Sequence, residues 1–242
     1  MAYYPLVFFL VFYLLNIKKD YTDLIIFLLF LYLSAIIGSY LLYILVNYKN
    51  VIFVFNNKKV FENNFSALRY IFGGSVFYGG LLGGIFTGYM LTRKYTVFKK
   101  YIDIVVVGIP LFHFFGRIGC FLGGCCYGIS CKFGFVYTNS PITEANGVMR
   151  FPIQLFEAVF NIGLFFLLNH LLNNEKFKDK LLYVYLLIYA TGRFFIEYLR
   201  GDIHRGVWFI FSTSQIISIL IILTVLIKII LNKWKKEKYT VI

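Results

Sequence analysis

The sequence predicts an all-α polytopic membrane protein with about seven transmembrane helices. Its 242 residues are 60% hydrophobic and only 14% charged, and the mean hydropathy is +0.77. Several apolar stretches reach the ~20 residues that an α-helix needs to cross the hydrocarbon core of a bilayer. Short basic segments separate these stretches, as expected for loops at a membrane surface. We therefore interpret residues 1–242 as a single integral membrane domain.

The net charge is +13, and the positions of the basic residues favour a lipid bilayer rather than nucleic acid as the partner. Most basic residues lie between apolar runs, where the bias of Lys and Arg toward the cytoplasm explains them. Assigning the lysine-rich segments to the inside places the N-terminus outside and the C-terminus in the cytoplasm. The first apolar run lacks the basic start and cleavage site of a signal peptide, so we expect it to be retained. A second interpretation of the charge is an anionic lipid or phosphate ligand.

Seven apolar stretches give the expected helices. Their approximate positions are 3–17, 22–46, 71–92, 101–123, 152–172, 181–199 and 208–231. Residues 49–70 mix aromatic, Asn and Lys side chains and suit an interfacial arm. Residues 126–150 are expected to form a polar loop on the outer face. The following helix starts favourably, because Pro152 is tolerated in a first turn.

Five arginines gather toward the predicted outer face, whereas the inner segments contain almost only lysine. They are Arg117, Arg150, Arg193, Arg200 and Arg205. The planar guanidinium group suits bidentate binding of phosphate. The competing interpretation is ordinary ion pairing with nearby acidic residues, which are Glu157, Glu197 and Asp202.

The sixth predicted helix ends in a charged cluster. Arg193, Glu197 and Arg200 are separated by four and three residues, which predicts that all three share one helix face. An ion pair with a spare arginine would position a phosphate. The same cluster would otherwise serve only to hold two helices together.

The fifth predicted helix has a polar stripe. Gln154, Glu157 and Asn161 lie on one helix face, which should point into the helix bundle rather than toward lipid. Hydrogen bonding between helices is the alternative interpretation of this stripe.

Glycines are concentrated in residues 72–84, which read FGGSVFYGGLLGG. Gly79, Gly80, Gly83 and Gly84 allow another backbone or a ligand to approach closely. Packing of small residues between transmembrane helices is a common alternative explanation.

The most informative segment is residues 116–128, GRIGCFLGGCCYG. Arg117 follows a long apolar run, and a charged residue in such a place is a functional-site candidate by default. His113 lies four residues earlier and should share its helix face. The nearby cysteines are Cys120, Cys125, Cys126 and Cys131. Their spacing lacks the C-x2-C pairs of zinc ribbons, so we expect no metal; a disulfide, packing and a direct site role remain open.

Four motifs in order resemble those of the prolipoprotein diacylglyceryl transferase family. The family signature has the form GRIGNFINGELYG, and the matching positions are Gly116, Arg117, Ile118, Gly119, Phe121, Gly124, Tyr127 and Gly128. FYGGLLGG is similar to a family HGGLIG, RFPIQLFEA to RHPSQLYEA, and RFFIEYLRGD to RFIVEFFREPD. The N-terminal Tyr4-Pro5-Leu6 is similar to a family YGL.

The chain departs from the family pattern at four positions. The asparagine and glutamate of the signature are replaced by Cys120 and Cys125, and the histidine before the glycine pair is Tyr78. An arginine of the family's second helix corresponds to Ile36. These changes resemble a cysteine-bearing branch of the family.

The resemblance implies transfer of a diacylglyceryl group from phosphatidylglycerol to the lipobox cysteine thiol of a preprolipoprotein. This is the first step of lipoprotein maturation in the bacterial cytoplasmic (inner) membrane, with no cofactor and no metal. The expected catalytic residues are Arg117, Arg193, Glu197, His113 and Tyr78. The expected substrate-binding residues are Tyr4, Gly79, Gly80, Gly119, Cys120, Gly124, Cys125, Gly128, Gln154, Glu157 and Arg200.

The resemblance gives the expected residues distinct roles. Arg117 and Arg193 would hold the phosphate, and Glu197 would orient Arg193 or Arg200. Tyrosine is a poor base at neutral pH, so His113 is a candidate replacement for the family histidine. The alternatives are a homologue with another donor or acceptor, a lipid-binding protein, a transporter, and a thiol-redox or metal protein built on the cysteines.

Overall fold

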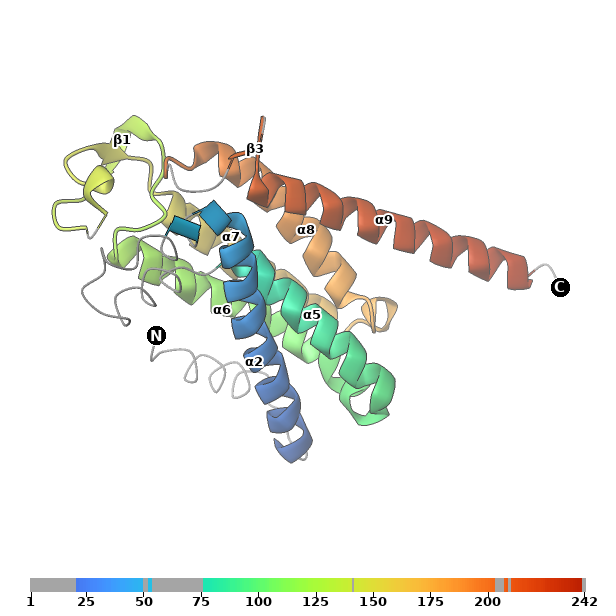
Figure 1. Ribbon diagram of the computed structural model, residues 1–242. Coiled ribbons are helices and arrows are strands. Elements are labelled where there is room, and N and C mark those ends of the chain that lie inside the picture. The colour runs from blue at the N-terminus through green and yellow to red at the C-terminus, as the bar shows by residue number, and fades with distance from the viewer. Residues whose placement is uncertain are drawn as a thin grey trace. The chain divides into compact units, whose positions relative to one another are not determined.

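The computed structural model describes residues 21–49, 52–53, 76–140, 142–202, 207–208 and 210–240. Its architecture is mostly helical (Figure 1), as the sequence predicts. The predicted helix at 3–17, residue Tyr4 and nearly all of the predicted arm at 49–70 lie outside the described residues. The chain forms two compact units, Lys18–Tyr101 and a unit that contains Ile102–Ile242. Each unit is described by itself below.

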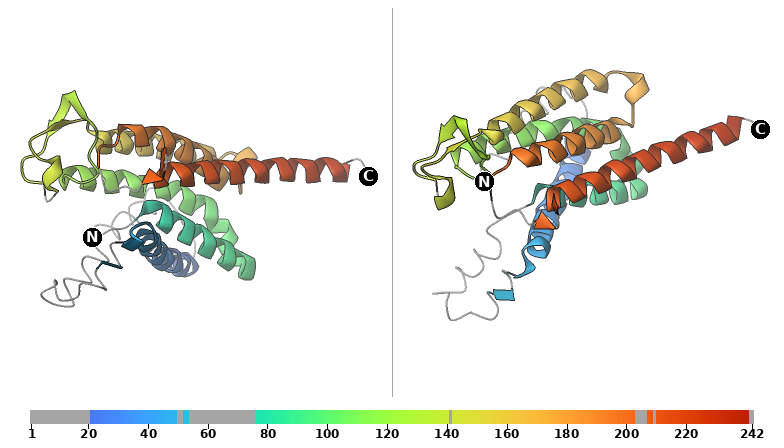
Figure 2. Two further views of the ribbon diagram at one scale, coloured as in Figure 1. Left: turned by 45° about the horizontal axis from the view of Figure 1, so that its top comes forward. Right: turned by 90° about the horizontal axis from the view of Figure 1, so that it is seen from above.

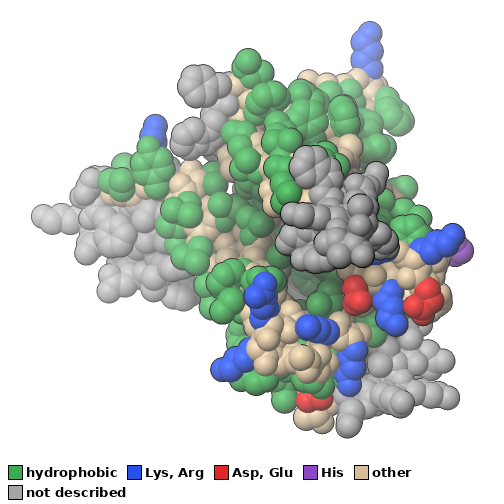
Figure 3. Space-filling model, turned by 90° about the vertical axis from the view of Figure 1, so that its right-hand side faces the viewer, with side chains coloured by type: hydrophobic (Ala, Val, Ile, Leu, Met, Phe, Trp, Pro, Cys, Tyr) green, Lys and Arg blue, Asp and Glu red, His purple; other side chains and the backbone are tan. Residues whose placement is uncertain are grey.

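Among the described residues, four helical segments are long and apolar enough to cross a membrane. They are Thr22–Val46, Thr96–Leu122, Ile153–Leu172 and Thr213–Asn232. Hydrophobic side chains cover much of the face drawn in Figure 3, and large apolar side chains such as Leu45 and Phe86 are exposed. An apolar surface of this kind is suited to lipid rather than to water. These features support a multi-pass membrane protein.

The unit Lys18–Tyr101 is built on two packed helices. They are α2 (Tyr21–Val46) and α5 (Phe77–Lys94), and a 3-10 turn, η2 (Thr96–Tyr101), follows α5. The second and third predicted helices correspond to α2 and α5. A β-carbon added to Gly79 would lie 2.3 Å from the carbonyl oxygen of Gly38, and one added to Gly83 would lie 2.5 Å from that of Ser34. The glycines of α5 therefore let two backbones touch.

This contact predicts a large difference between two glycines of α5. Gly79→Ala should destabilise the protein by about 1–3 kcal/mol, because the added β-carbon would lie 2.3 Å from the carbonyl oxygen of Gly38 and one of the two backbones would have to shift. Gly84→Ala is the matched control, since no described atom lies within 4 Å of the added carbon. We expect the control to be neutral or stabilising by ~0.5–1 kcal/mol. Thermal unfolding in one detergent would compare the two variants, and equal midpoints would contradict the packing role.

Four helices form the framework of the unit Ile102–Ile242. They are α6 (Ile102–Leu122), α7 (Ile153–Leu172), α8 (Leu181–Ile196) and α9 (Thr213–Thr240). Short 3-10 turns, η4 (Glu175–Phe177) and η5 (Glu197–Leu199), lie at the two ends of α8. Helix α7 packs on α6, and α9 packs on α8 (Figure 2). As predicted, α7 begins directly after Pro152.

The predicted loop at 126–150 contains strands as well as irregular chain. Strand β1 (Ser130–Val136) pairs antiparallel with β2 (Met149–Arg150), and η3 (Thr143–Ala145) lies between them. Tyr127, Tyr137 and Ala145 form a small apolar core under the loop. This core and the strand pair give the loop a fixed conformation at the end of α6.

A second strand pair precedes α9. Strand β3 (Val207–Trp208) pairs antiparallel with β4 (Phe211–Ser212). The helix predicted at 208–231 therefore begins later, at Thr213, and extends to Thr240. Gln215 fixes this start, because its Oε1 atom accepts a hydrogen bond from the backbone N–H of Ser212 at 2.9 Å.

Candidate active site

Glu157 lies at the centre of a buried charge cluster and contacts two arginines. Its Oε2 atom is 2.6 Å from Arg117 Nε, and its Oε1 atom accepts a hydrogen bond of 2.9 Å from Arg193 Nη1. The Glu157 side chain is only 3% exposed. Charges at this depth require partners, because an isolated buried ion costs several kcal/mol. One carboxylate on α7 thus joins an arginine of α6 to an arginine of α8.

Arg193 has its polar atoms engaged on three sides. Besides Glu157, it contacts Glu197 Oε2 at 2.5 Å and donates a hydrogen bond to Ser214 Oγ at 3.4 Å. Arg193 and Glu197 are four residues apart, and the last turn of α8 leads directly into η5. The guanidinium of Arg193 is therefore held rigidly between α7, η5 and the start of α9.

The guanidinium of Arg117 contacts the protein through its Nε atom. Its Nε atom faces Glu157 and also donates a hydrogen bond of 3.2 Å to His113 Nε2. Within the described ranges, neither Nη atom of Arg117 forms a hydrogen bond to the protein. The predicted common face of His113 and Arg117 is confirmed. The arginine is fixed through one nitrogen while its two terminal nitrogens remain available.

The predicted position of Arg200 on the last helix face of α8 is wrong. It was expected on the same helix face as Arg193 and Glu197, but α8 ends at Ile196 and the backbone of Arg200 is extended. The chain leaves the helix because this segment pairs with the loop that follows α6 (residues 123–129, called the signature loop below), with Gly128 bridged to Arg200. The Arg200 side chain forms two hydrogen bonds to Asp202, of 2.9 and 2.5 Å.

The polar stripe of α7 is buried, as predicted. Gln154, Glu157 and Asn161 are each at most 2% exposed. Gln154 Nε2 donates hydrogen bonds to the carbonyl of Cys125 at 2.7 Å and to Tyr137 Oη at 3.2 Å. Among the described residues, Gln154 Oε1 and Asn161 Oδ1 are buried without a hydrogen-bond partner. Two acceptors are thus unused in the protein interior, which is costly unless a ligand completes them.

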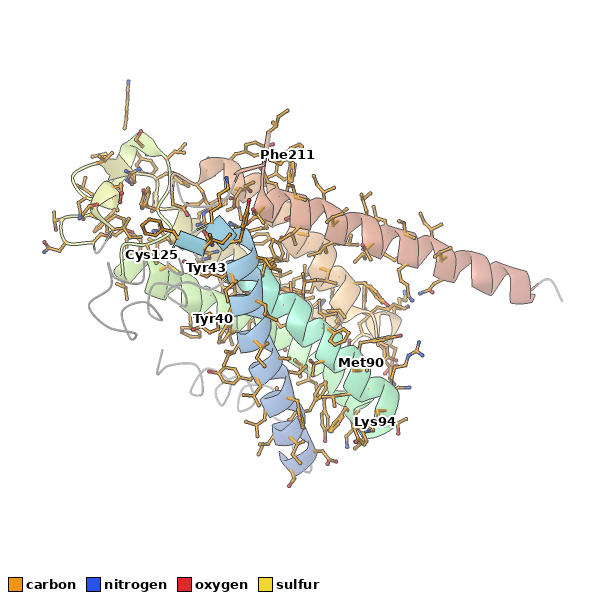
Figure 4. All side chains as sticks on the ribbon, in the orientation of Figure 1. Tyr40, Tyr43, Met90, Lys94, Cys125 and Phe211 are labelled. Carbon is orange, nitrogen blue, oxygen red and sulfur yellow. The ribbon has the colours of Figure 1, made fainter. Side chains whose placement is uncertain are left out.

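Three of the four cysteines meet at the end of α6. The sulfur atoms of Cys120, Cys125 and Cys126 all lie within 4.8 Å of one another, and all four cysteines are free thiols. Figure 4 labels Cys125 where α6 meets the loop that carries β1. The pKa of the Cys126 thiol lies well below its usual value. Hydrogen bonds from the thiols of Cys120 and Cys125 are the main cause, and the charges of Arg200 and Arg117 act in the same direction, whereas burial raises the pKa.

Glycines let the signature loop pack against two other segments. A β-carbon on Gly128 would lie 2.2 Å from the carbonyl oxygen of Phe151, so only glycine fits there. Gly124 has a φ of 66° and faces Ser140, a conformation that favours glycine. Gly119 has no described atom near its missing β-carbon. The predicted binding glycines of this loop therefore have structural roles at Gly124 and Gly128, whereas Gly119 is open.

The remaining predicted site residues lie in the unit Lys18–Tyr101 or outside the described ranges. Tyr78 is buried on α5 at 2% exposure, beside the glycines that pack on α2. The packing alternative accounts for Gly79 and Gly80, since added β-carbons would meet the carbonyl oxygens of Gly38 and Ala35. The structure thus groups Arg117, His113, Glu157, Arg193 and Glu197 within one unit.

Sequence reasoning missed two partners of the cluster. Ser214 and Tyr137, from distant parts of the chain, accept hydrogen bonds from Arg193 and Gln154. Arg150, one of the five arginines of the predicted outer face, lies over the Tyr127 ring, 4.1 Å from its centroid, and supports the loop rather than the charge cluster. The sequence carried no signal for Ser214 or Tyr137, because such contacts depend on the tertiary fold.

Comparison with known proteins identifies the family of this chain. A sequence model of the family described as prolipoprotein diacylglyceryl transferase matches residues 3–231. The chain belongs to this family. It is 36% identical over 210 residues to a phosphatidylglycerol–prolipoprotein diacylglyceryl transferase of Clostridium tetani, a match that covers 85% of the chain and 79% of the relative.

Other relatives in the family extend the similarity. A second phosphatidylglycerol–prolipoprotein diacylglyceryl transferase, from Clostridium perfringens, is 35% identical over 212 residues, covering 86% of the chain and 78% of that protein. The corresponding protein of Rickettsia africae is 32% identical over 200 residues, covering 78% and 70%. The membership predicted from four motifs is therefore confirmed over most of the chain.

Proposed function

We propose that this member of the prolipoprotein diacylglyceryl transferase family transfers diacylglyceryl from phosphatidylglycerol to the lipobox cysteine thiol of preprolipoproteins. The enzyme would act in the bacterial cytoplasmic membrane as a single domain with about seven spans. The lysine-rich segments orient it with the N-terminus outside and the C-terminus in the cytoplasm. Both substrates are membrane-bound, so they reach the site from the bilayer.

The observation that carries this proposal is the asymmetric use of the two arginines that flank Glu157. Both Nη atoms of Arg193 contact protein side chains, whereas Arg117 is anchored through Nε and neither of its Nη atoms forms a hydrogen bond to a described residue. Two parallel N–H donors suit a phosphate diester. The fixed Glu157 and Arg193 charges keep the Arg117 fork in place before the lipid arrives.

The headgroup also requires partners for its hydroxyl groups. The buried oxygens Gln154 Oε1 and Asn161 Oδ1 are acceptors without a described partner. The terminal glycerol of phosphatidylglycerol carries hydroxyl donors that fit such acceptors. Completing them would recover ~1–3 kcal/mol per buried group, which favours a headgroup with hydrogen-bond donors over a quaternary ammonium headgroup, which has none.

The transfer is a substitution in which a thiol replaces a phosphate ester. The acceptor sulfur forms a bond to the glyceryl carbon, and the carbon–oxygen bond to the phosphate breaks. Glycerol phosphate leaves with the bonding electron pair, and the thiol proton passes to a base. The negative charge that grows on the leaving oxygen is stabilised by Arg117, and such preorganised donors contribute most in the transition state.

His113 offers a test of how this proton is handled. Its Nε2 lone pair accepts the hydrogen bond from Arg117, so we expect a positioning role. His113→Gln retains an acceptor and should keep much of the activity with an unchanged pH profile, whereas His113→Leu should lose it. A general base would behave otherwise: both variants would fall by about 10²–10⁴-fold. Initial rates measured across pH for the two variants decide between these roles.

Complementation of a transferase-depleted bacterium tests the proposed function directly. The full chain should restore growth, and mass spectrometry of a reporter lipoprotein should show a diacylglyceryl increment on the lipobox cysteine. A reporter with serine in place of that cysteine is the matched control. Absence of the increment from a well-expressed membrane protein would refute the proposal.

The cysteine substitutions in the signature favour one second candidate, a family member with another donor or acceptor. Cys120 and Cys125 replace residues that the resemblance places in the substrate site. Purified protein offered phosphatidylglycerol beside phosphatidylethanolamine and phosphatidylserine would separate the two ideas. Transfer from phosphatidylglycerol alone supports the main proposal, and preferential use of another lipid supports the second.

A further inference from the structure

We propose that Cys120, Cys125 and Cys126 form a three-thiolate zinc site whose fourth position binds the acceptor cysteine. The three sulfur atoms already lie within 4.8 Å of one another. Zinc–sulfur bonds of about 2.3 Å in a tetrahedral site separate the sulfurs by about 3.8 Å. Shifts of about 1 Å or less at each contact would therefore close the site, which side-chain rotation can supply.

The backbone around these cysteines is arranged to direct them to one point. Cys126 has a φ of 55°, a left-handed conformation that residues other than glycine rarely adopt, and Gly124 has a φ of 66°. This turn brings two consecutive cysteines toward Cys120 on the last turns of α6. Strain of this kind persists where the surrounding structure fixes it, and it is concentrated at functional sites.

Buried hydrogen bonds hold the turn in place. The backbone N–H of Cys125 donates to the carbonyl of Cys120 at 3.1 Å, and Gln154 Nε2 donates to the carbonyl of Cys125 at 2.7 Å. Gln154 is only 1% exposed. The cysteines themselves are partly exposed, so these hydrogen bonds fix the turn while the three residues keep some contact with their surroundings.

The position of the cluster connects it to the proposed reaction. Arg117 and Cys120 are three residues apart on α6, which places them on neighbouring parts of one helix face. A donor phosphate at Arg117 would thus lie near the sulfurs. Three protein ligands with an open fourth position are typical of a catalytic rather than a structural zinc site. The inferred role rests on the proposed diacylglyceryl transfer.

The chemistry follows from the need for a thiolate nucleophile. The acceptor thiol would replace water at the fourth position and release its proton to solvent, because a thiol that coordinates zinc is deprotonated. Its sulfur then forms the bond to the glyceryl carbon as the carbon–oxygen bond breaks and glycerol phosphate leaves. No electrons are exchanged with the metal. The thioether product is neutral and a weaker ligand than a thiolate, so it is released.

Metal analysis of the full-length protein in detergent tests the site itself. Protein grown with added zinc should contain about one zinc per chain by inductively coupled plasma mass spectrometry. Cobalt added to the metal-free protein should give thiolate-to-cobalt charge-transfer absorption. Cys120→Ser, Cys125→Ser and Cys126→Ser should each abolish that absorption, whereas Cys131→Ser, whose cysteine lies outside the cluster, should retain it. Wild-type protein without zinc or cobalt binding would overturn the proposal even if the variants misfold.

A second experiment tests the open position and separates this inference from the proposed function. A lipobox peptide should change the cobalt spectrum, whereas its serine analogue should not. Removing zinc should lower transfer by more than ~10-fold, since the outer partners of metal ligands alone often contribute 10–100-fold, and zinc but not magnesium should restore it. Full transfer by metal-free protein, or a disulfide within the cluster of active enzyme, would refute the site and leave the transferase function intact. A cobalt spectrum that responds to the peptide, without transfer from phosphatidylglycerol, would support the site and refute that function.

Discussion

Replacing Arg117 by alanine is expected to lower kcat/KM for diacylglyceryl transfer by about 10²–10³-fold, the usual effect of removing one transition-state donor. The reason is that neither Nη atom of Arg117 forms a hydrogen bond to a described residue, so both can bind the phosphate. Arg117→Lys should preserve the ion pair with Glu157 but not the planar fork, so we expect it to remain strongly impaired. Purified variants in lipid nanodiscs, assayed for diacylglyceryl transfer to a reporter peptide, give the measurement.

Two controls make this result specific. Arg93→Ala removes an arginine that contacts the Tyr89 ring at the end of α5, and its activity should remain near that of the wild type. Circular dichroism should show that the Arg117 variants stay folded. Activity of Arg117→Ala within about threefold of the wild type would contradict a phosphate-binding role, since a lost charge-assisted hydrogen bond of ~1.5–3 kcal/mol predicts far more.

Replacing Glu157 is expected to have the largest effect on stability. Glu157→Gln removes the negative charge that separates Arg117 from Arg193, and truncating one member of a buried ion pair typically costs 3–5 kcal/mol. The double variant Glu157→Gln with Arg117→Met should recover part of this loss, because Glu157 is the carboxylate that pairs with Arg117, whereas Arg193 keeps its contact with Glu197. Thermal unfolding of all three proteins in the same detergent measures the effect.

An exposed glutamate provides the matched comparison. Glu175 has a side chain that is 87% exposed and a contact of 3.7 Å with Lys178. Glu175→Gln should change stability by less than about 0.5 kcal/mol, because exposed ion pairs contribute little. Equal losses for Glu157→Gln and Glu175→Gln would mean that the buried cluster does not hold α6, α7 and α8 together.

The helical framework was predictable because lipid-facing helices require long apolar stretches, and these are visible in any window of the sequence. The expected helix at 152–172 differs from α7 by one residue at its start. The end of α8 was not predictable in this way. Arg200 has the right spacing to continue the helix, but backbone hydrogen bonds with the signature loop, such as Ile129 N–H to the Leu199 carbonyl at 3.0 Å, favour an extended chain.

The candidate site was likewise predictable only in part. Sequence motifs identified Arg117, Glu157 and Arg193 individually, because charges within apolar segments are costly and therefore stand out. Their spacing along the chain could not show that one carboxylate contacts both arginines, since the three residues come from different helices. The glycines of α5 could have faced a ligand or another helix, and their contacts with the backbone of α2 account for Gly79, Gly80 and Gly83 by packing, although not for Gly84.

The sequence by itself determined the membrane class, the family and the residue types of the site, because hydrophobicity and short motifs are local properties of the chain. Only the tertiary structure decided which charges neutralise each other, which nitrogens of Arg117 remain available, and that three cysteines meet at one point. These features depend on distances between segments that are far apart in sequence. Such distances follow from how helices pack and where the chain turns, and no local pattern encodes them.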